Sequence, residues 1–190
     1  MKRIVVGISG ASGVIYGIRL LEVLKELPAE THLVLTEEAK KNILLETTST
    51  VKDVEGLAYQ VHDFKDLAAP ISSGSFKTDG MVIAPCTIKT LSAVANSYNE
   101  NLLIRAADVT LKERRLLILV VRETPLHKGH LELMNRVADL GGVILPPVPA
   151  FYHRPEGIDD LINHTTGKIL DLFGIENTLF RRWKGRKEPT

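Results

Sequence analysis

The first twenty residues place a short strand, a glycine-rich loop and a helix in immediate succession. Residues 3–6, Arg-Ile-Val-Val, are typical of a buried strand in a parallel sheet. The loop at residues 7–13 follows, and from Ile15 onward apolar residues recur at the spacing of one helical face. Backbone N–H groups point outward from such a helix start, and the helix dipole adds partial positive charge there. The segment therefore predicts an anion site, and a phosphate is its expected occupant.

The details of this loop narrow the kind of phosphate ligand. The loop contains no lysine, which disfavours the P-loop of ATPases and kinases. Its glycines fall at 7, 10 and 13, so the dinucleotide fingerprint G-x-G-x-x-G is not met. The next predicted strand is followed by Thr36, where a dinucleotide site needs an acidic residue for the ribose hydroxyls. These features argue against NAD and favour a mononucleotide such as FMN; the alternative is a glycine turn that only lets strand and helix pack closely.

Composition excludes several classes of protein. The 190-residue chain has a formal net charge of +1, with 44% hydrophobic and 25% charged residues, which is typical of one globular domain and gives no electrostatic case for nucleic acid. No apolar run reaches the roughly 18 residues of a membrane span. No signal-peptide pattern precedes the first strand, so we expect a cytoplasmic protein. A single cysteine, Cys86, excludes an internal disulfide, and the six histidines lack a metal-ligand spacing, so we expect no metal site.

Predicted strands alternate with predicted helices along the chain. The strands fall at residues 3–6, 30–35, 62–64, 80–84, 116–121 and 142–145, and the helices at 15–24, 37–45, 51–59, 88–95, 101–113, 130–140 and 155–173. This alternation predicts an α/β fold: a three-layer Rossmann-like or flavodoxin-like parallel sheet with helices on both faces. We expect a single domain over residues 1–183 and a flexible charged tail over residues 184–190.

Ligands of such folds bind outside the carboxyl ends of the strands, so the residues that follow each strand are site candidates. They are residues 9–13, Thr36, residues 86–90, Arg122 and Glu123. Hydroxyl and backbone N–H groups suit a phosphate, and an arginine can pair with it through two hydrogen bonds. Together these strand ends favour a phosphorylated ligand.

Charged side chains elsewhere suggest a second anion site. Arg105, Asp108 and Lys112 share one face of a predicted helix, either as an exposed ion-pair ladder or as two cations beside a cleft. Glu46 and Glu123 are the candidate acid–base groups. Glu123 is favoured because it lies between a buried strand and a proline, which fix its position.

The last predicted helix places Lys168 in one stripe with Leu161, Thr165 and Leu172, near an apolar face. The lysine either snorkels to the rim of that face or reaches a subunit boundary or pocket. Tyr152 follows a run of prolines and is a candidate to present its phenol to the same pocket.

Seven motifs, spread over nearly the whole chain, resemble the UbiX family of flavin prenyltransferases. An older name of this family is phenylacrylic acid decarboxylase, or 3-octaprenyl-4-hydroxybenzoate carboxy-lyase partner protein. The motifs are GISGASG at residues 7–13, SSGS at 72–75, APCT at 84–87, IRAADV at 104–109, LKERR at 111–115, RETPL at 122–126 and PAFYH at 149–153.

The resemblance implies a Rossmann-like or flavodoxin-like domain that assembles into a dodecamer with FMN at the subunit contacts. It also implies a metal-independent transferase, which moves a dimethylallyl group from dimethylallyl monophosphate to N5 and C6 of reduced FMN. The product, prenylated FMN, serves a UbiD-type decarboxylase in ubiquinone biosynthesis or aromatic-acid decarboxylation. An FMN-binding accessory subunit of an aromatic-acid decarboxylase and a flavin-dependent decarboxylase remain the alternatives.

The resemblance also implies roles for individual residues. The flavin-binding set is Gly10, Ala11, Ser12, Thr36, Thr87, Ile88, Lys89, Thr90 and Arg122. The set around the prenyl phosphate is Glu46, Arg105, Lys112, Tyr152 and Lys168, and the catalytic set is Glu123, Lys112 and Arg105. Lys168 stands where many members have arginine, so a guanidinium that can donate two hydrogen bonds to a phosphate is replaced by the point charge of an ammonium. Thr36 stands where many members have serine, and it keeps the hydroxyl.

Overall fold

A computed structural model describes residues 1–185 of the chain. Contacts divide it into two compact units, Met1–Pro147 and Val148–Thr190, which are described separately here. Of the tail predicted at residues 184–190, only residues 184 and 185 fall among those described. The domain boundary after residue 183 stays a prediction.

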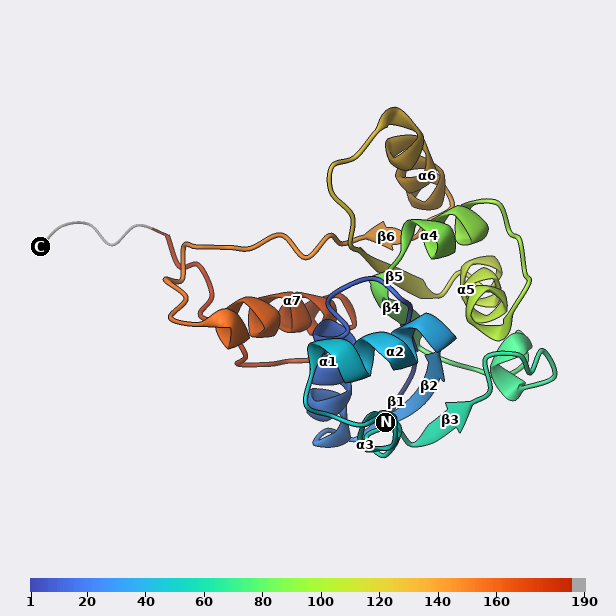
Figure 1. Cartoon of the computed structure of the whole chain (residues 1–190), viewed down its shortest axis with the longest axis horizontal. Helices are drawn as coiled ribbons and strands as arrows, with labels where there is room; N and C mark the ends of the chain where they lie inside the picture. Colours follow the sequence, from blue (N-terminus) through green and yellow to red (C-terminus); the bar gives the residue numbers. More distant parts are fainter. Residues whose placement is uncertain (186–190) are drawn as a thin grey trace, which may run out of the picture. The chain divides into compact units, whose positions relative to one another are not determined.

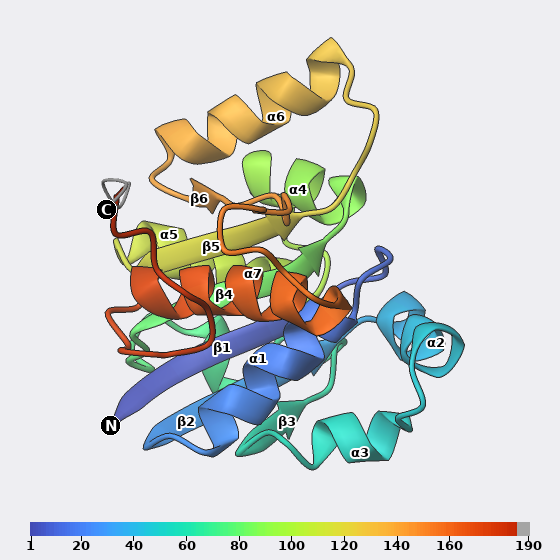
Figure 2. The same cartoon turned by 90° about the vertical axis from the view of Figure 1, so that its left-hand side faces the viewer.

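The first unit contains one parallel sheet, drawn in Figures 1 and 2. Its strands are β1 (Lys2–Ile8), β2 (Ala29–Leu35), β3 (Gln60–His62), β4 (Gly80–Cys86), β5 (Leu116–Val121) and β6 (Val143–Ile144). Their order is β3-β2-β1-β4-β5-β6, and every neighbouring pair is parallel. This is the order of doubly wound dinucleotide-binding folds, so the predicted α/β class is confirmed.

Helices cover both faces of this sheet. They are α1 (Ile15–Lys25), α2 (Glu37–Glu46), α3 (Val51–Glu55), α4 (Ile88–Ala95), α5 (Leu102–Lys112) and α6 (Lys128–Asp139), with a single 3₁₀ turn, η1, at Pro70–Ser72. Helix α1 packs against β1, β2 and β4, whereas α4 and α5 pack on the opposite face (Figures 1 and 2). Gly17 permits the close approach of α1, because a Cβ there would lie 2.3 Å from the carbonyl oxygen of Ala84.

The sheet has its topological switch point between β1 and β4. The chain leaves β1 through α1 to β2 on one side, and returns after β3 to form β4 on the other side. The helices that follow β1 and β4 therefore lie on opposite faces, and the loops before them separate. Such a separation creates a crevice at the carboxyl ends of the two strands, where doubly wound proteins bind ligands.

Several predicted element boundaries are wrong. The edge strand predicted at residues 62–64 lies at Gln60–His62, and the strand predicted to end at residue 84 continues through a cis Ala84–Pro85 peptide to Cys86. The sheet accommodates the proline by a shift of register between Ile83 and Cys86 in the pairing with β5. In the second unit, the helix predicted from residue 155 begins at Ile158, as α7 (Ile158–Leu172).

A polar network crosses the amino half of the sheet. The guanidinium of Arg3 donates two hydrogen bonds to the Glu30 carboxylate, at 2.6 and 2.9 Å. His32 Nε2 lies 2.8 Å from Glu30 Oε1, and His32 Nδ1 lies 2.8 Å from His62 Nε2. Because a carboxylate only accepts, neutral His32 donates from Nε2 and accepts the His62 Nε2 proton on Nδ1. This arrangement requires that His32 and His62 are not both charged.

The network predicts a pH-dependent stability. Burial and the neighbouring His32 lower the pKa of His62, while Asp66 acts in the opposite direction. His62 therefore stabilises the fold above its unfolded pKa of about 6.5, and this contribution is lost as pH falls below that value. We expect the free energy of unfolding, measured with urea, to decrease from pH 7 to pH 5, and His62→Gln to flatten that decrease. The exposed His127, changed to glutamine, is the control; equal slopes in the wild type and His62→Gln would contradict the prediction.

Candidate functional site

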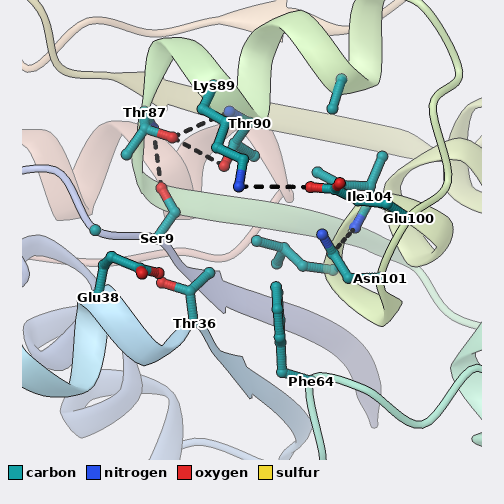
Figure 3. A pocket seen from close by; sticks show the side chains of 13 residues that line it. Ser9, Thr36, Glu38, Phe64, Thr87, Lys89, Thr90, Glu100, Asn101 and Ile104 are labelled. Atoms are coloured by element: carbon teal, nitrogen blue, oxygen red, sulfur yellow. Dashed lines mark hydrogen bonds and ion pairs between the residues drawn. The ribbon is translucent and has the colours of Figure 1, made fainter.

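A pocket of about 240 Å³ opens at the carboxyl ends of β1 and β4 (Figure 3). Its hydroxyl side is formed by Ser9, Thr36, Thr87 and Thr90, and its apolar wall by Phe64, Ala93, Leu103 and Ile104. Gly10, Glu38, Lys89, Glu100 and Asn101 complete the lining. A pocket with an apolar wall and a polar side suits a ligand that has a flat ring system and a phosphate.

Ser9 joins the ends of the two central strands. Its backbone N–H and its hydroxyl both donate to the carbonyl oxygen of Pro85, at 3.2 and 2.9 Å. The same hydroxyl accepts the backbone N–H of Thr87 at 2.9 Å. Ser9 is fully enclosed, at 1% exposure, so these bonds are shielded from water. The crevice therefore has a fixed width at its base.

Three helix N-termini line the pocket, each with a side-chain cap (Figure 3). Thr36 Oγ1 accepts the Ala39 N–H at the start of α2, at 3.0 Å. Thr87 Oγ1 does the same for the Thr90 N–H at the start of α4, at 3.0 Å, and it also donates to the Thr90 hydroxyl. Asn101 caps α5 through the Ile104 N–H. The partial positive charge of three helix dipoles therefore faces one small volume, which favours an anion.

Gly10 can only be glycine at this place in the pocket. A Cβ there would lie 2.2 Å from the Cβ of Glu38, and Glu38 backbone atoms lie only 3.3 Å away. The Asn42 amide donates to the carbonyl oxygens of Gly10 and Ala11, at 3.1 and 3.2 Å, and holds the loop in place. Of the predicted residues Gly10, Ala11 and Ser12, the pocket lining includes Gly10.

The start of α1, where a phosphate is expected from the sequence, carries a carboxylate of this chain. Glu46 Oε2 accepts the backbone N–H groups of Gly13 and Val14, at 2.8 and 3.3 Å. Val14, the N-cap residue of α1, contributes no side-chain cap. Glu46 thus lies at the glycine-rich loop, and it occupies part of the anion-binding position of that helix.

Arg122 and Glu123 follow β5 and are both exposed. The backbone N–H of Arg122 donates to the carbonyl oxygen of Cys86, which fixes the residue beside the β4 exit. Burial raises the pKa of the Tyr16 phenol, and the charge of Arg122 acts in the opposite direction, so Arg122 and the first turn of α1 are neighbours. Glu123 Oε1 accepts the N–H of Thr124 at 3.0 Å, which aligns its carboxylate along the loop.

Arg105 and Lys112 lie on α5 but face the loop at residues 72–76. Arg105 Nε donates to the Ser72 carbonyl oxygen at 3.1 Å, and Arg105 also pairs with Asp108 at 3.3 Å. Lys112 pairs with Glu113, and its ammonium lies beside Gly74. The pair of Arg105 with Asp108 is one step of the ladder expected as one alternative, whereas Lys112 pairs with Glu113 instead. Arg105 and Lys112 are absent from the described residues that line the pocket.

Tyr152 and Lys168 belong to the second unit. The Tyr152 hydroxyl lies 3.4 Å from His164 Nε2, and its ring meets Trp183 edge to face. Of the predicted stripe, Thr165 is buried, and Lys168 lies between the buried residues Gly167 and Ile169 at the edge of the buried face of α7. Lys168 is exposed and lies 3.9 Å from Asp171, so its ammonium reaches solvent.

The described part of the chain contains neither a cluster of metal-ligating side chains nor an accessible thiol. Residues 1–185 hold no group of three or more metal-ligating side chains. Cys86 is fully buried, and burial raises the pKa of its thiol above the usual range. A thiol in this state is a poor nucleophile. None of the described helices is long and apolar enough to span a bilayer.

Seven residues of the pocket lining are not among the predicted site residues: Glu38, Phe64, Ala93, Glu100, Asn101, Leu103 and Ile104. Tyr16, beside Arg122, is also not among them. Asn101 has a readable signal, because it precedes an apolar helix and caps it through the residue three positions on. Phe64, Tyr16 and Glu100 have none, since they reach the site through tertiary packing.

Comparisons with known proteins agree with this geometry. The profile of the family described as Flavoprotein matches residues 1–170. The flavin prenyltransferase UbiX of Thauera aromatica is 60% identical over 186 residues, which cover 98% of this chain and 96% of that protein. The flavin prenyltransferase UbiX of Escherichia coli strain K12 is 58% identical over 188 residues, which cover 97% of this chain and all of that protein (100%).

Solved structures give the same result. The crystal structure of AnUbiX (PadA1) in complex with FMN and dimethylallyl pyrophosphate superposes with a TM-score of 0.96 at 48% identity, over 98% of this chain and 99% of that one. A dodecameric FMN-dependent UbiX-like decarboxylase from Escherichia coli O157:H7 superposes with a TM-score of 0.95 at 48% identity, over 96% of this chain and 100% of that one. The chain therefore belongs to the Flavoprotein family and, within it, to the UbiX flavin prenyltransferases.

Proposed function

We propose that this chain is a flavin prenyltransferase, which moves a dimethylallyl group from dimethylallyl monophosphate to N5 and C6 of reduced FMN. The observation that carries the proposal is the pocket at the switch point, where three capped helix starts and Gly10 surround one crevice. The AnUbiX structure, in complex with FMN and dimethylallyl pyrophosphate, supports the choice of ligands.

FMN is a substrate in this proposal, and the chain supplies its binding groups. The capped starts of α2 and α4 bind the anionic end through backbone N–H groups and the hydroxyls of Thr36, Thr87 and Thr90. The apolar wall around Phe64 and Leu103 excludes water from the ring. Ala11, Ser12, Ile88, Lys89 and Arg122 complete the flavin-binding set that we propose.

In the prenyl transfer, cations stabilise the leaving phosphate, and acid–base groups act only in the later proton transfers. The allylic carbon forms a bond to flavin N5 as its bond to the phosphate oxygen breaks, and the leaving phosphate gains charge. The resemblance assigns the stabilisation of that charge to Arg105, Lys112 and Lys168, and the positioning of the prenyl phosphate to Tyr152 and Glu46. Because the resemblance places FMN at the subunit contacts, different protomers of the proposed homo-oligomer supply these residues. Closure joins C6 to the tertiary carbon of the prenyl double bond: one proton adds to the other carbon of that double bond and one proton leaves C6, and Glu123 or the departing phosphate transfers these protons.

The assembly and the destination of the product belong to the same proposal. We propose a cytoplasmic homo-oligomer, in agreement with the dodecameric relative from Escherichia coli O157:H7. The prenylated FMN passes to a UbiD-type decarboxylase of ubiquinone biosynthesis or aromatic-acid decarboxylation. The similarity to the flavin prenyltransferases of Thauera aromatica and Escherichia coli favours the transferase over a role as an accessory subunit or a decarboxylase.

The activity can be tested by measuring the mass of the flavin by mass spectrometry. We expect that incubation of the protein with reduced FMN and dimethylallyl monophosphate increases the flavin mass by one dimethylallyl group. Glu123→Gln and Lys112→Ala should each slow this change by about 10²–10⁴-fold, because they remove a proton acceptor and a cation from the transition state. Both variants should still bind FMN. An unchanged flavin mass with the wild-type protein would overturn the proposal, and release of carbon dioxide from a substrate without a second protein would favour the decarboxylase alternative.

Gly10 provides a test of the pocket itself. Gly10→Ala forces a Cβ against Glu38, so the loop or the start of α2 must move. We expect the affinity for FMN, measured by flavin fluorescence, to fall by about tenfold, which corresponds to an overpacking cost of about 1–3 kcal/mol. Gly157→Ala is the matched control, because a Cβ at Gly157 meets nothing within 4 Å. Equal FMN affinity in the two variants would show that the flavin does not contact this loop.

A further inference from the structure

An ion pair joins two sides of the pocket mouth. Lys89 Nζ, from the first turn of α4, lies 3.6 Å from Glu100 Oε1, just before α5 (Figure 3). Both residues line the pocket. The Lys89 side chain is 86% exposed, whereas that of Glu100 is 36% exposed, so fewer neighbouring atoms confine the lysine.

Lys89 is the one cation among the described residues that line this pocket, and Glu38 and Glu100 are its two carboxylates. A phosphate bound at the helix starts therefore lies near the Lys89 ammonium, which is already paired with the Glu100 carboxylate. The phosphate and Glu100 are both anions, so they compete for Lys89, and Glu100 also repels the bound phosphate.

The Glu100 carboxylate neither caps a helix nor takes part in the backbone hydrogen bond of its own residue. The cap of α5 is the side chain of the next residue, Asn101, and the backbone N–H of Glu100 bonds to the carbonyl oxygen of Tyr98 without help from the carboxylate. An exposed pair at 3.6 Å contributes little to stability. Its position at the mouth of the ligand pocket is what distinguishes it.

We infer that Glu100 is a positioning residue that limits how tightly the flavin phosphate is held, by competing with that phosphate for Lys89. This inference rests on the proposed function, in which FMN enters as substrate and leaves as product. An enzyme that makes a cofactor for another protein must release it. A carboxylate that takes back the ammonium as the phosphate leaves favours that release.

The test is a double-mutant cycle on FMN binding. FMN dissociation constants and dissociation rates are measured by flavin fluorescence for the wild type, Glu100→Gln, Lys89→Met and the double variant, at low and high salt. We expect Glu100→Gln to tighten FMN binding by about two- to fivefold at low salt and to slow its dissociation by a similar factor, since an exposed pair is worth up to about fivefold. The gain should shrink at high salt and vanish in the Lys89→Met background.

Two further measurements identify the cause. Glu38→Gln removes a carboxylate from the same pocket, and its effect should not depend on Lys89. Riboflavin lacks the phosphate, so Glu100→Gln should leave its affinity unchanged. The inference is overturned if Glu100→Gln leaves FMN binding unchanged, if its effect persists without Lys89, or if riboflavin gains equally. In each of those cases wild-type FMN binding still supports the proposed function, whereas a wild-type protein that binds no FMN would overturn both.

Discussion

The hydrogen bonds of Ser9 hold the site together. β1 and β4 are neighbours in the sheet, but their chains leave it toward opposite faces, and nothing in the strand ladder itself fixes how far their exits separate. Ser9 fixes that distance by bonding to the Pro85 carbonyl and to the Thr87 N–H. The capped start of α4 is thereby held at a set distance from the loop that contains Gly10. The Thr87 and Thr90 hydroxyls on that side of the pocket are therefore positioned by the hydrogen bonds of Ser9.

This architecture explains how a phosphate site can exist without a P-loop lysine. The starts of α2, α4 and α5 bring backbone N–H groups and dipoles to one pocket from three separate parts of the sequence. The dipoles add their attraction to that of Lys89, the one full positive charge among the described residues that line the pocket. The glycine-rich loop before α1, where the sequence predicts a phosphate, contributes Gly10 to the lining of the same pocket. Its own N–H groups at Gly13 and Val14 bind Glu46.

The fold and part of the site could be predicted from the sequence because their signals are local. The caps at Thr36 and Thr87 lie three residues before the N–H groups that they accept, and the alternation of apolar runs gives the parallel sheet. The contact of Glu46 with Gly13 joins residues 33 positions apart, so no local pattern predicts it. The position of Lys168 at the edge of the buried face of α7 follows from helical periodicity, in which each residue rotates the stripe by about 100°.

The burial of Cys86 has a consequence for a protein that handles reduced flavin. Reduced flavins react with dioxygen and produce peroxide, which oxidises accessible thiolates to sulfenic acid and beyond. The one thiol of this chain lies within β4, enclosed by the core, and its raised pKa keeps it protonated. It therefore presents neither the access nor the thiolate that peroxide requires. The strand end that shapes the flavin pocket is thus also chemically resistant to the by-product of its own ligand.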